Sequence, residues 1–475
     1  MTKILMVASE AAPFAKTGGL ADVLGSLPGA VASLGDEVAV LLPRYRDVKL
    51  EGVTRTYYSL PVWLGGTYYE TTLYRVDRNG VPYFLLDCPV LFQRDGLYGD
   101  ARGDFPDNYL RFGVFARAAL EVVRRVFRPN VIHCHDWQAG LIPAFMRSTL
   151  VGDPTFIGIK TLFTIHNLGY QGLFPKTILP QLGLDASLFH PEGLEFYNAV
   201  SFLKAGLVYS DALTTVSPTY AHEIQTPEYG FGLDGVLRAR AGVLTGILNG
   251  VDYDLWNPET DAFLAANYSV ENLAGKRVCK QELLRQFGLP SNGLDRPVIG
   301  IVSRFTSQKG ADLIAAVAPE LSAERAYLVA LGSGDAAYEQ MFLDLARAHP
   351  DSIAVRIGYD DRLAHQIEAG SDLFLMPSRY EPCGLNQIYS LRYGTVPVVR
   401  ATGGLDATIE EGTGFKFSEY SGVAMLAAVR EALEAFRNRE EWLAMMKRGM
   451  RKDFSWRASA AEYSKLYREL VRQGP

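Results

Sequence analysis

Glu381 lies on a short charged turn, RYEPCG, between an apolar run and a predicted helix. The run at 372–376 has the composition of a strand that is covered on both faces, as strands of parallel sheets are. Pro377 ends the strand, and we expect a helix to begin at Gly384. A carboxylate and helix N–H groups at the carboxyl end of a strand form a usual ligand position in open α/β sheets. The alternative is a tight turn whose charges are only solvated.

Two further loops place cations in the same kind of position. Lys16 lies in AKTGGLAD, between an apolar strand at 3–9 and a helical pattern at 20–34. Arg304 and Lys309 lie in SRFTSQK, directly after a strand that opens the second half. Adjacent glycines let a ligand approach the backbone, and an Arg fork with a Lys point charge suits a diphosphate. The first loop lacks the Walker A spacing, and each loop has the alternative of a solvated basic turn.

Polar side chains also follow two strands of the first half. Asp136, in HCHDWQAG, comes at the end of a strand at 130–134. His166, in HNLGYQG, comes at the end of a strand at 159–165. Both positions favour contact with a ligand, and the alternative for His166 is a packed, hydrogen-bonded histidine.

The sequence predicts no metal site and no disulfide. We expect His133 and His135 to point to opposite faces of their strand, which argues against a shared metal ion. The four cysteines are far apart and lack metal-ligand spacing. Diphosphate sites often use Mg²⁺, but no paired-Asp motif stands out at a strand end, and the cations can replace the metal.

One motif favours a different chemistry, that of a nicotinamide oxidoreductase. Residues 332–337, GSGDAA, match the dinucleotide pattern G-x-G-x-x-A. In a dinucleotide fold this motif follows the first strand of its domain, whereas here it follows the second. We therefore set the oxidoreductase aside.

The composition of the chain excludes further classes of function. The 475 residues exceed what one hydrophobic core usually serves, and the net charge of -6, with both signs interspersed, gives no footprint for nucleic acid. The apolar run at 4–8 is too short for a signal peptide, and no stretch is long enough to cross a bilayer. We expect a cytoplasmic protein that binds neither nucleic acid nor membrane. The oligomeric state cannot be predicted.

Strands alternate with helices through both halves, which predicts an α/β protein with two doubly wound parallel-sheet domains. The predicted domains are 1–245 and 246–455, and the segment 456–475 is a helix expected to pack back on the first domain. In the first domain we also expect strands at 57–64, 70–76 and 81–86 as an antiparallel edge or insertion, and a helix at 195–209.

Six motifs, KTGGLAD, HDWQAG, HNLGYQG, LNGVD, SRFTSQKG and PSRYEPCGLNQ, occur in this order over essentially the whole chain. The set resembles the bacterial glycogen synthases and the related plant starch synthases. That resemblance implies two Rossmann-like domains facing each other across a deep cleft, the GT-B fold. It also implies a retaining glucosyltransferase that extends an α-1,4-glucan, glycogen, from ADP-glucose as co-substrate, without a cofactor.

The resemblance also implies roles for individual residues. Lys16, Arg304 and Lys309 would neutralise the diphosphate, and Glu381 and His166 would hold the transferred glucose. The remaining substrate-binding positions would be Asp136 and Asn249 in the cleft, Tyr359 against the nucleobase, and Gly19, Asp22, Cys383, Gly384, Leu385 and Asn386 around the sugar and phosphates. Two positions depart from the family motifs, Phe305 and Asn386, so the share of Asn386 in phosphate binding is open.

Two alternatives remain beside this function. One keeps the fold and changes the substrates, as in another GT-B glucosyltransferase or a phosphorylase-like enzyme. The other is a non-catalytic glucan-binding protein, against which the presence of Lys16, Arg304, Lys309 and Glu381 speaks. Retention would ordinarily need a carboxylate nucleophile. Glu381 and Asp136 are candidates, but we favour same-face attack with the leaving phosphate as base.

Overall fold

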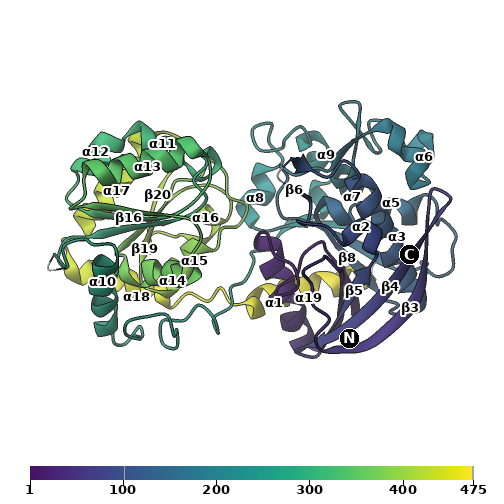
Figure 1. The fold of residues 1–475 in the computed structure, drawn as a ribbon, viewed down its shortest axis with the longest axis horizontal. Helices are drawn as coiled ribbons and strands as arrows, with labels where there is room; N and C mark the ends of the chain where they lie inside the picture. Colours follow the sequence, from purple (N-terminus) through teal and green to yellow (C-terminus); the bar gives the residue numbers. More distant parts are fainter. Residues whose placement is uncertain (101, 292, 473–475) are drawn as a thin grey trace. The chain divides into compact units, whose positions relative to one another are not determined.

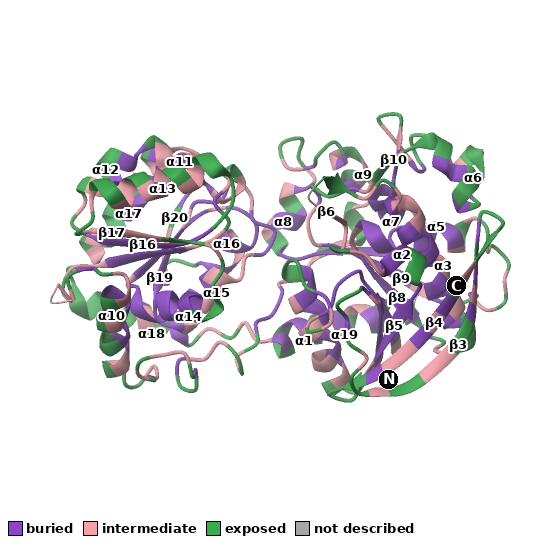
Figure 2. Ribbon diagram, viewed as in Figure 1, coloured by how far each residue is buried: buried purple, intermediate pink, exposed green. Residues whose placement is uncertain are grey.

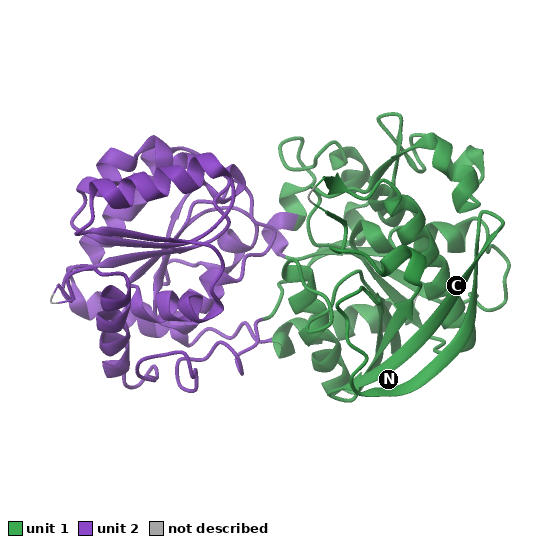
Figure 3. Ribbon diagram, viewed as in Figure 1, with its two compact units in different colours: residues 1–216, 221–250, 456–475 green, residues 217–220, 251–455 purple. Residues whose placement is uncertain are grey.

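The computed structural model describes residues 1–100, 102–291 and 293–472. The chain forms two compact units (Figure 3). The first contains Met1–Val216, Ala221–Gly250 and the C-terminal segment from Trp456, and the second contains Ser217–Tyr220 and Val251–Ser455. The expected boundary at 245 is therefore corrected to 250. It cannot lie at 245, because β14 (Leu244–Gly246) is the last strand of the first sheet.

The first unit is built on a nine-stranded sheet with the order β14-β13-β9-β8-β1-β2-β5-β4-β3. Its strands are β1 (Lys3–Val7), β2 (Glu37–Pro43), β3 (Val53–Leu64), β4 (Thr67–Arg78), β5 (Val81–Asp87), β8 (Val131–His135), β9 (Lys160–Ile165), β13 (Ala212–Thr215) and β14. All pairs from β14 to β5 are parallel, whereas β4 is antiparallel to both β5 and β3. The antiparallel edge expected from the sequence is thus confirmed for β3 and β4. The strand β5 belongs to the parallel core.

Burial explains this division of the sheet. The parallel strands β1 and β8 are almost entirely buried, because helices cover both of their faces. The strands β3 and β4 alternate between buried and exposed residues, as Figure 2 shows by their mixed colours. Such alternation is typical of an antiparallel edge with one face in water. The helices of this unit are α1 (Gly19–Ser33), α2 (Pro89–Phe92), α3 (Asn108–Arg125), α4 (Asp136–Ala139), α5 (Leu141–Arg147), α6 (Leu179–Leu182), α7 (Phe202–Tyr209), α9 (Asp234–Ala239) and α19 (Trp456–Arg472).

The helix predicted at 195–209 is wrong in its first half. Residues Glu195–Phe196 and Ala199–Ser201 form two short antiparallel strands, β11 and β12, and β12 also pairs with β10 (Leu173–Pro175). The connecting residues Tyr197 and Asn198 both have positive φ, as a two-residue hairpin turn requires. Ser201 then caps α7 by accepting a hydrogen bond from the backbone N–H of Lys204. The helix therefore begins at Phe202.

The last helix, α19, belongs to the first unit and packs against α1 (Figure 1). Its Tyr467 is fully buried, and the hydroxyl is hydrogen-bonded to Nδ1 of His133 at 2.8 Å. The chain enters the second unit at Val251 and leaves it after Ser455, where the N–H of Val251 donates to the carbonyl of Phe454 at 2.9 Å. The first unit is therefore discontinuous in sequence.

The second unit contains a six-stranded, wholly parallel sheet with the order β17-β16-β15-β18-β19-β20. Its strands are β15 (Val298–Val302), β16 (Tyr327–Gly332), β17 (Ile353–Ile357), β18 (Leu373–Met376), β19 (Val396–Arg400) and β20 (Phe415–Phe417). The helices are α10 (Ala274–Gln286), α11 (Ala311–Ala316), α12 (Ala318–Ala323), α13 (Ala336–Ala348), α14 (Asp361–Gly370), α15 (Asn386–Arg392), α16 (Gly403–Thr408), α17 (Gly422–Ala435) and α18 (Arg439–Met450). A further helix, α8 (Pro218–Glu223), is shared between the units.

Helices cover both faces of this second sheet (Figure 1). In β16, Leu328 and Ala330 pack toward α11, α12, α13 and α17, whereas Val329 and Leu331 pack toward α10 and α14. Alternate residues of a strand point to opposite faces, so a strand between two helical layers must be apolar throughout. The prediction of a doubly wound parallel sheet is confirmed for this unit. Among the helices of the described residues, none combines the length and apolar character needed to cross a bilayer.

Candidate active site

Glu10 organises the glycine-rich loop at the start of α1, and the sequence did not indicate this role. It follows β1 and is 3% exposed. Its carboxylate accepts hydrogen bonds from the N–H of Thr17 at 2.5 Å, the hydroxyl of Thr17 at 2.6 Å and the N–H of Gly18 at 3.3 Å. Tyr98 donates to the same carboxylate at 2.6 Å. Four hydrogen bonds to one buried carboxylate fix the loop that carries Lys16.

The start of α1 has the properties expected of an anion site. Gly18 is the N-cap, and a Cβ atom added to Gly18 or Gly19 would meet no atom within 4 Å. Open space beside the first turn of a helix leaves room for a phosphate to reach the backbone N–H groups. Nζ of Lys16 lies 2.7 Å from the carboxylate of Asp22, and both side chains are largely exposed. Asp22 therefore contacts Lys16 and holds that cation beside the helix start.

Asp136 and His166 are brought together at the carboxyl ends of the neighbouring strands β8 and β9. The Asp136 carboxylate accepts a hydrogen bond from the N–H of His166 at 2.8 Å, and Asp136 itself has a φ of +56°. Burial raises the pKa of Asp136 to about 7, against the opposing effect of this hydrogen bond. Burial also lowers the pKa of His166 to about 3, so its imidazole is neutral near pH 7.

The expectation for His133 and His135 is wrong. Residues two apart in a strand lie on the same face, and the two rings are in contact, tilted by 36° with centroids 4.0 Å apart. His133 is fully buried and hydrogen-bonded through both nitrogens, to Tyr467 at 2.8 Å and to Thr164 at 2.6 Å. His135 is hydrogen-bonded to His166 through Nδ1 at 3.0 Å. Among the described residues, no group of three His, Cys, Asp or Glu side chains could hold a metal ion.

Asn249 follows β14, at the far end of the same sheet edge. It is 7% exposed, and its Oδ1 atom is buried without a hydrogen-bond partner among the described residues. A buried, unsatisfied amide oxygen is costly, and a functional role is one of the reasons for which such groups are retained. Next to it, Gly250 contacts the backbone of Trp456 so closely that an added Cβ would lie 2.4 Å from its Cα. The loop is therefore fixed by the start of α19.

In the second unit, Arg304 and Lys309 lie on the connection from β15 to α11. Arg304 is exposed and donates to the side chain of Gln308 at 3.0 Å. Gly310 has a φ of +80°, and an added Cβ would lie 2.2 Å from the carbonyl oxygen of Pro377. Only glycine allows the loops after β15 and β18 to pack this closely. This contact places Lys309 next to Glu381.

Lys309 and Glu381 form the central ion pair of this unit. Nζ of Lys309 lies 2.5 Å from Oε2 of Glu381, with the two side chains 21% and 8% exposed. The Ser378 hydroxyl donates to the same oxygen at 3.1 Å. Oε1 of Glu381 has no hydrogen-bond partner among the described residues. That oxygen is therefore available to accept from a ligand hydroxyl.

A glycine pair that the sequence analysis overlooked supports the Glu381 turn. The backbone N–H of Gly404, at the start of α16, donates to the carbonyl of Glu381 at 3.0 Å. A Cβ added to Gly403 would lie 1.8 Å from that carbonyl oxygen, and one added to Gly404 would lie 1.7 Å from the carbonyl oxygen of Cys383. The residues TGG at 402–404 follow β19 after Ala401, so their place at a strand end could have indicated this contact.

The remaining predicted residues of the second unit divide into two groups. Cys383, Gly384 and Leu385 lie on the turn that leads into α15, and Gly384 has the positive φ of +67° that glycine favours. Tyr359 lies apart from them, on the loop after the edge strand β17. Its ring is 84% exposed, and its hydroxyl donates to Asp361 at 3.1 Å. All these loops lie at the carboxyl edge of one parallel sheet, where α/β proteins bind ligands.

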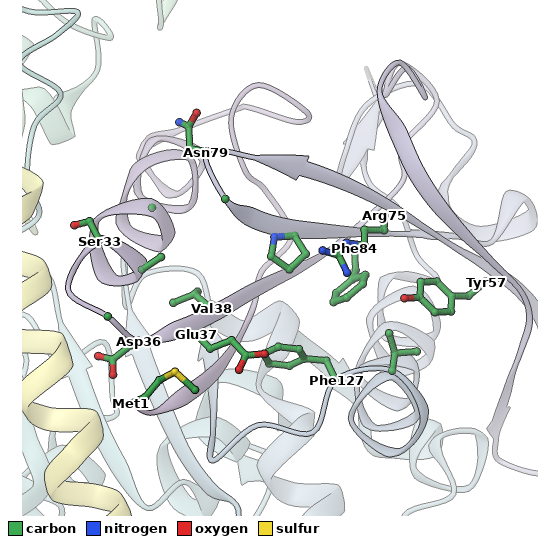
Figure 4. A pocket seen from close by; sticks show the side chains of 16 residues that line it. Met1, Ser33, Asp36, Glu37, Val38, Tyr57, Arg75, Asn79, Phe84 and Phe127 are labelled. Carbon is green, nitrogen blue, oxygen red and sulfur yellow. The ribbon is translucent and has the colours of Figure 1, made fainter.

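A separate hollow of about 600 Å³ lies in the first unit (Figure 4). Its lining includes Met1, Asp36, Glu37, Arg75 and Phe127. Met1 and Asp36 precede β1 and β2, so this hollow lies at the amino ends of the strands. It is thus at the opposite edge of the sheet from the residues described above, and we do not assign it to the active site.

The comparison with known proteins covers the chain from end to end. The family model described as the starch synthase catalytic domain matches residues 3–239, and that for glycosyl transferases group 1 matches residues 287–447. Glycogen synthase of Koribacter versatilis is 54% identical over 98% of this chain and 97% of its own. The chain belongs to the glycogen and starch synthase family. Glycogen synthase of Myxococcus xanthus is 50% identical over 99% of this chain and 100% of its own.

Solved structures agree with this membership of the glycogen and starch synthase family. The catalytic domain of starch synthase IV from Arabidopsis thaliana, bound to ADP and acarbose, has a TM-score of 0.88 at 33% identity and covers 99% of both chains. Sucrose-phosphate synthase from Thermosynechococcus elongatus has a TM-score of 0.63 at 18% identity over 100% of both chains, which shows a shared fold only. The predicted GT-B fold, with two Rossmann-like units, is confirmed.

The two departures from the glycogen and starch synthase motifs have structural explanations. Phe305 is 1% exposed and packs on Phe342 with ring centroids 4.3 Å apart, so it fills the core beneath the loop. Asn386 donates from its side-chain amide to the carbonyl of Val302 at 2.8 Å. This bond ties the start of α15 to the end of β15. Asn386 therefore positions the loop that carries Arg304.

Proposed function

We propose that the chain transfers glucose from ADP-glucose to the non-reducing end of an α-1,4-glucan, with retention of configuration and release of ADP. The observation that carries this proposal is the partly buried Lys309–Glu381 pair at the carboxyl edge of the second sheet. Relatives named glycogen synthase, and a starch synthase structure that holds ADP, support a nucleotide-sugar donor and a glucan acceptor.

The charges that develop during the reaction indicate the role of the cations. Cleavage of a glucosyl–phosphate bond places positive charge on the sugar and negative charge on the departing diphosphate. Arg304 and Lys309 stabilise that negative charge, because both lie on the loop after β15 and Lys309 is held in place by Glu381 before the reaction. Lys16 supplies a third cation, next to the open first turn of α1.

The polar side chains with unsatisfied atoms bind the glucose. Oε1 of Glu381 accepts from a sugar hydroxyl, since Oε2 is already occupied by Lys309 and Ser378. His166 and Asn249 contribute a ring nitrogen and an amide oxygen, and Asp136 fixes the His166 backbone. Tyr359 offers an exposed ring to the nucleobase.

Retention follows from attack on the same face of the sugar, with the leaving phosphate as base. A covalent route through Glu381 is disfavoured, because its Oε2 is engaged by a cation and a hydroxyl, both of which reduce the nucleophilicity of the carboxylate. Isolation of a glucosylated Glu381 peptide by mass spectrometry would contradict this assignment.

We also propose that no metal ion takes part, because Arg304 and Lys309 supply the charge that Mg²⁺ would otherwise supply. Turnover is expected to persist in excess EDTA. Complete loss of turnover that returns when Mg²⁺ is added would refute the proposal.

The deciding experiment supplies radiolabelled ADP-glucose or UDP-glucose, each with and without glycogen, and measures label in precipitated polymer. We expect incorporation that requires glycogen and is faster with ADP-glucose. The absence of transfer from both donors would refute the proposed synthase activity.

We place the reaction in the cytoplasm, which is supported by four buried cysteines that form no disulfide.

A further inference from the structure

His135, at the end of β8, is a buried titratable group that the proposed mechanism does not use. Its ring is fully buried, and burial holds the pKa of His135 well below its usual value. The ring is therefore neutral and carries a single proton. Nδ1 lies 3.0 Å from Nε2 of His166, while Nε2 is buried with no hydrogen-bond partner among the described residues.

The position of the single proton on His135 determines the tautomer of His166. A hydrogen bond between two neutral imidazoles needs one donor and one acceptor. If His135 carried its proton on Nε2, that N–H would be a buried donor without a partner. If His135 carries its proton on Nδ1, the atom left without a partner is the unprotonated Nε2, which is an acceptor. Buried N–H donors without a partner are rarer in proteins than buried acceptors without one. The second arrangement is therefore favoured.

The surroundings prevent the His135 ring from turning to exchange its nitrogens. The ring packs against that of His133, with centroids 4.0 Å apart and planes tilted by 36°. That ring is itself held at both nitrogens, by Tyr467 of α19 and by Thr164 of β9. Thr164 is in turn hydrogen-bonded to Thr214 of β13 at 2.5 Å. The His135 ring is thus supported by three neighbouring elements.

We propose that His135 is a positioning residue that holds His166 in the tautomer protonated on Nδ1, so that His166 presents an N–H donor to a hydroxyl of the transferred sugar. His166 accepts from His135 through Nε2, and Asp136 fixes its backbone N–H at 2.8 Å. Nδ1 of His166 has no hydrogen-bond partner in the part of the chain that the structure describes, but unlike Nε2 of His135 it is not a buried atom, so an N–H there can donate to solvent or to a sugar. The sugar contact rests on the proposed function, whereas the tautomer does not.

The tautomer is measured directly on the full-length protein labelled with ¹⁵N-histidine. Long-range ¹H–¹⁵N spectra distinguish protonated from unprotonated ring nitrogens, and the His166→Asn variant assigns the signal. We expect protonated Nδ1 and unprotonated Nε2 for His166 at neutral pH, with or without substrate. A His166 signal protonated on Nε2 would overturn the proposal, whether or not the protein transfers glucose.

Two variants of nearly the same shape test the consequence for turnover. His135→Asn keeps an N–H donor near the position of Nδ1, whereas His135→Leu removes the donor and leaves a similar gap. For His135→Leu we expect a mixture of His166 tautomers and a fall in kcat/KM of about 10-fold to 10²-fold, the effect of one lost hydrogen bond to the reacting sugar. For His135→Asn the wild-type tautomer and most of the activity should return. Equal activity of the two variants would refute the positioning role, and if neither folds, the wild-type spectrum still decides.

Discussion

Replacement of Lys309 by Met removes a cation from the second unit and leaves the Glu381 carboxylate without its ion-pair partner. Nζ and Oε2 are 2.5 Å apart, and the side chains are 21% and 8% exposed. Loss of one partner of a buried ion pair lowers the free energy of unfolding by about 3–5 kcal/mol. Because Lys309 is partly exposed, we expect about 3 kcal/mol, the lower end of that range. For a unit of this size that corresponds to a Tm lower by about 6–12 °C.

The same substitution should lower turnover for a separate reason. Lys309 stabilises charge that develops on the departing diphosphate, and removal of one such preset group costs about 10²-fold to 10³-fold in kcat. The two effects can be separated with the double variant Lys309→Met/Glu381→Gln. Glutamine carries no charge, so most of the lost Tm should return, whereas the missing cation should keep kcat low.

The assays are calorimetry for Tm and incorporation of label from ADP-glucose for kcat, each on the wild type, both single variants and the double variant. Near wild-type kcat in Lys309→Met would refute the role of this cation in the reaction. Recovery of kcat in the double variant would show instead that Lys309 acts only by neutralising Glu381.

Three further predictions follow from the geometry. The pKa of Asp136 is about 7 in the folded protein and has its ordinary, lower value in the unfolded chain. Between these two pKa values the folded state binds a proton that the unfolded state has released. Asp136 therefore destabilises the fold more and more as the pH rises from the lower value to the higher one. Asp136→Asn should therefore gain more Tm relative to wild type at pH 8 than at pH 5, and the reverse trend in calorimetry would contradict the assignment. Glu10→Gln should lower the free energy of unfolding, measured by urea titration, by about 2–3 kcal/mol, because one carboxylate oxygen that accepts from Thr17 and Gly18 is replaced by an amide NH₂ group. The variant should also speed the hydrogen exchange of the backbone amides at 15–19. Unchanged exchange would show that Glu10 does not fix this loop. Tyr359→Ala should raise KM for ADP-glucose severalfold with kcat and Tm unchanged, since the ring is exposed, and an unchanged KM would remove Tyr359 from the nucleobase site.

The sequence predicted well those features that depend on local pattern. The alternation of strands and helices expected for the second unit is observed, because apolar runs bounded by Gly and Pro alternate there with amphipathic helices. Loops after such strands must meet at one edge of a parallel sheet, so Arg304, Lys309 and Glu381 could be grouped before any coordinates. The contact between Lys309 and Glu381 was beyond prediction, because it depends on the close packing of Gly310 against Pro377.

The failures have equally specific causes. The region 195–201 has apolar spacing that fits a helix, but Tyr197 and Asn198 adopt positive φ. Positive φ is uncommon for residues other than glycine, so it is difficult to predict from these residue types. The function of Glu10 depends on Thr17, Gly18 and on Tyr98, which is distant in sequence. The faces of His133 and His135 were misjudged, although the two-residue period of a strand places them together.

The return of α19 to the first unit has a consequence for the order in which the protein can mature on the ribosome. Domains usually fold from the N-terminus as they emerge. Here the first unit lacks the hydroxyl of Tyr467, which is bonded to His133, until the whole second unit has been synthesised. A nascent chain that ends at Gly250 should expose the surface of α1 that α19 covers, and Nδ1 of His133 should lack its hydrogen bond to Tyr467. Completion of this part of the first unit is therefore delayed until α19 has been synthesised.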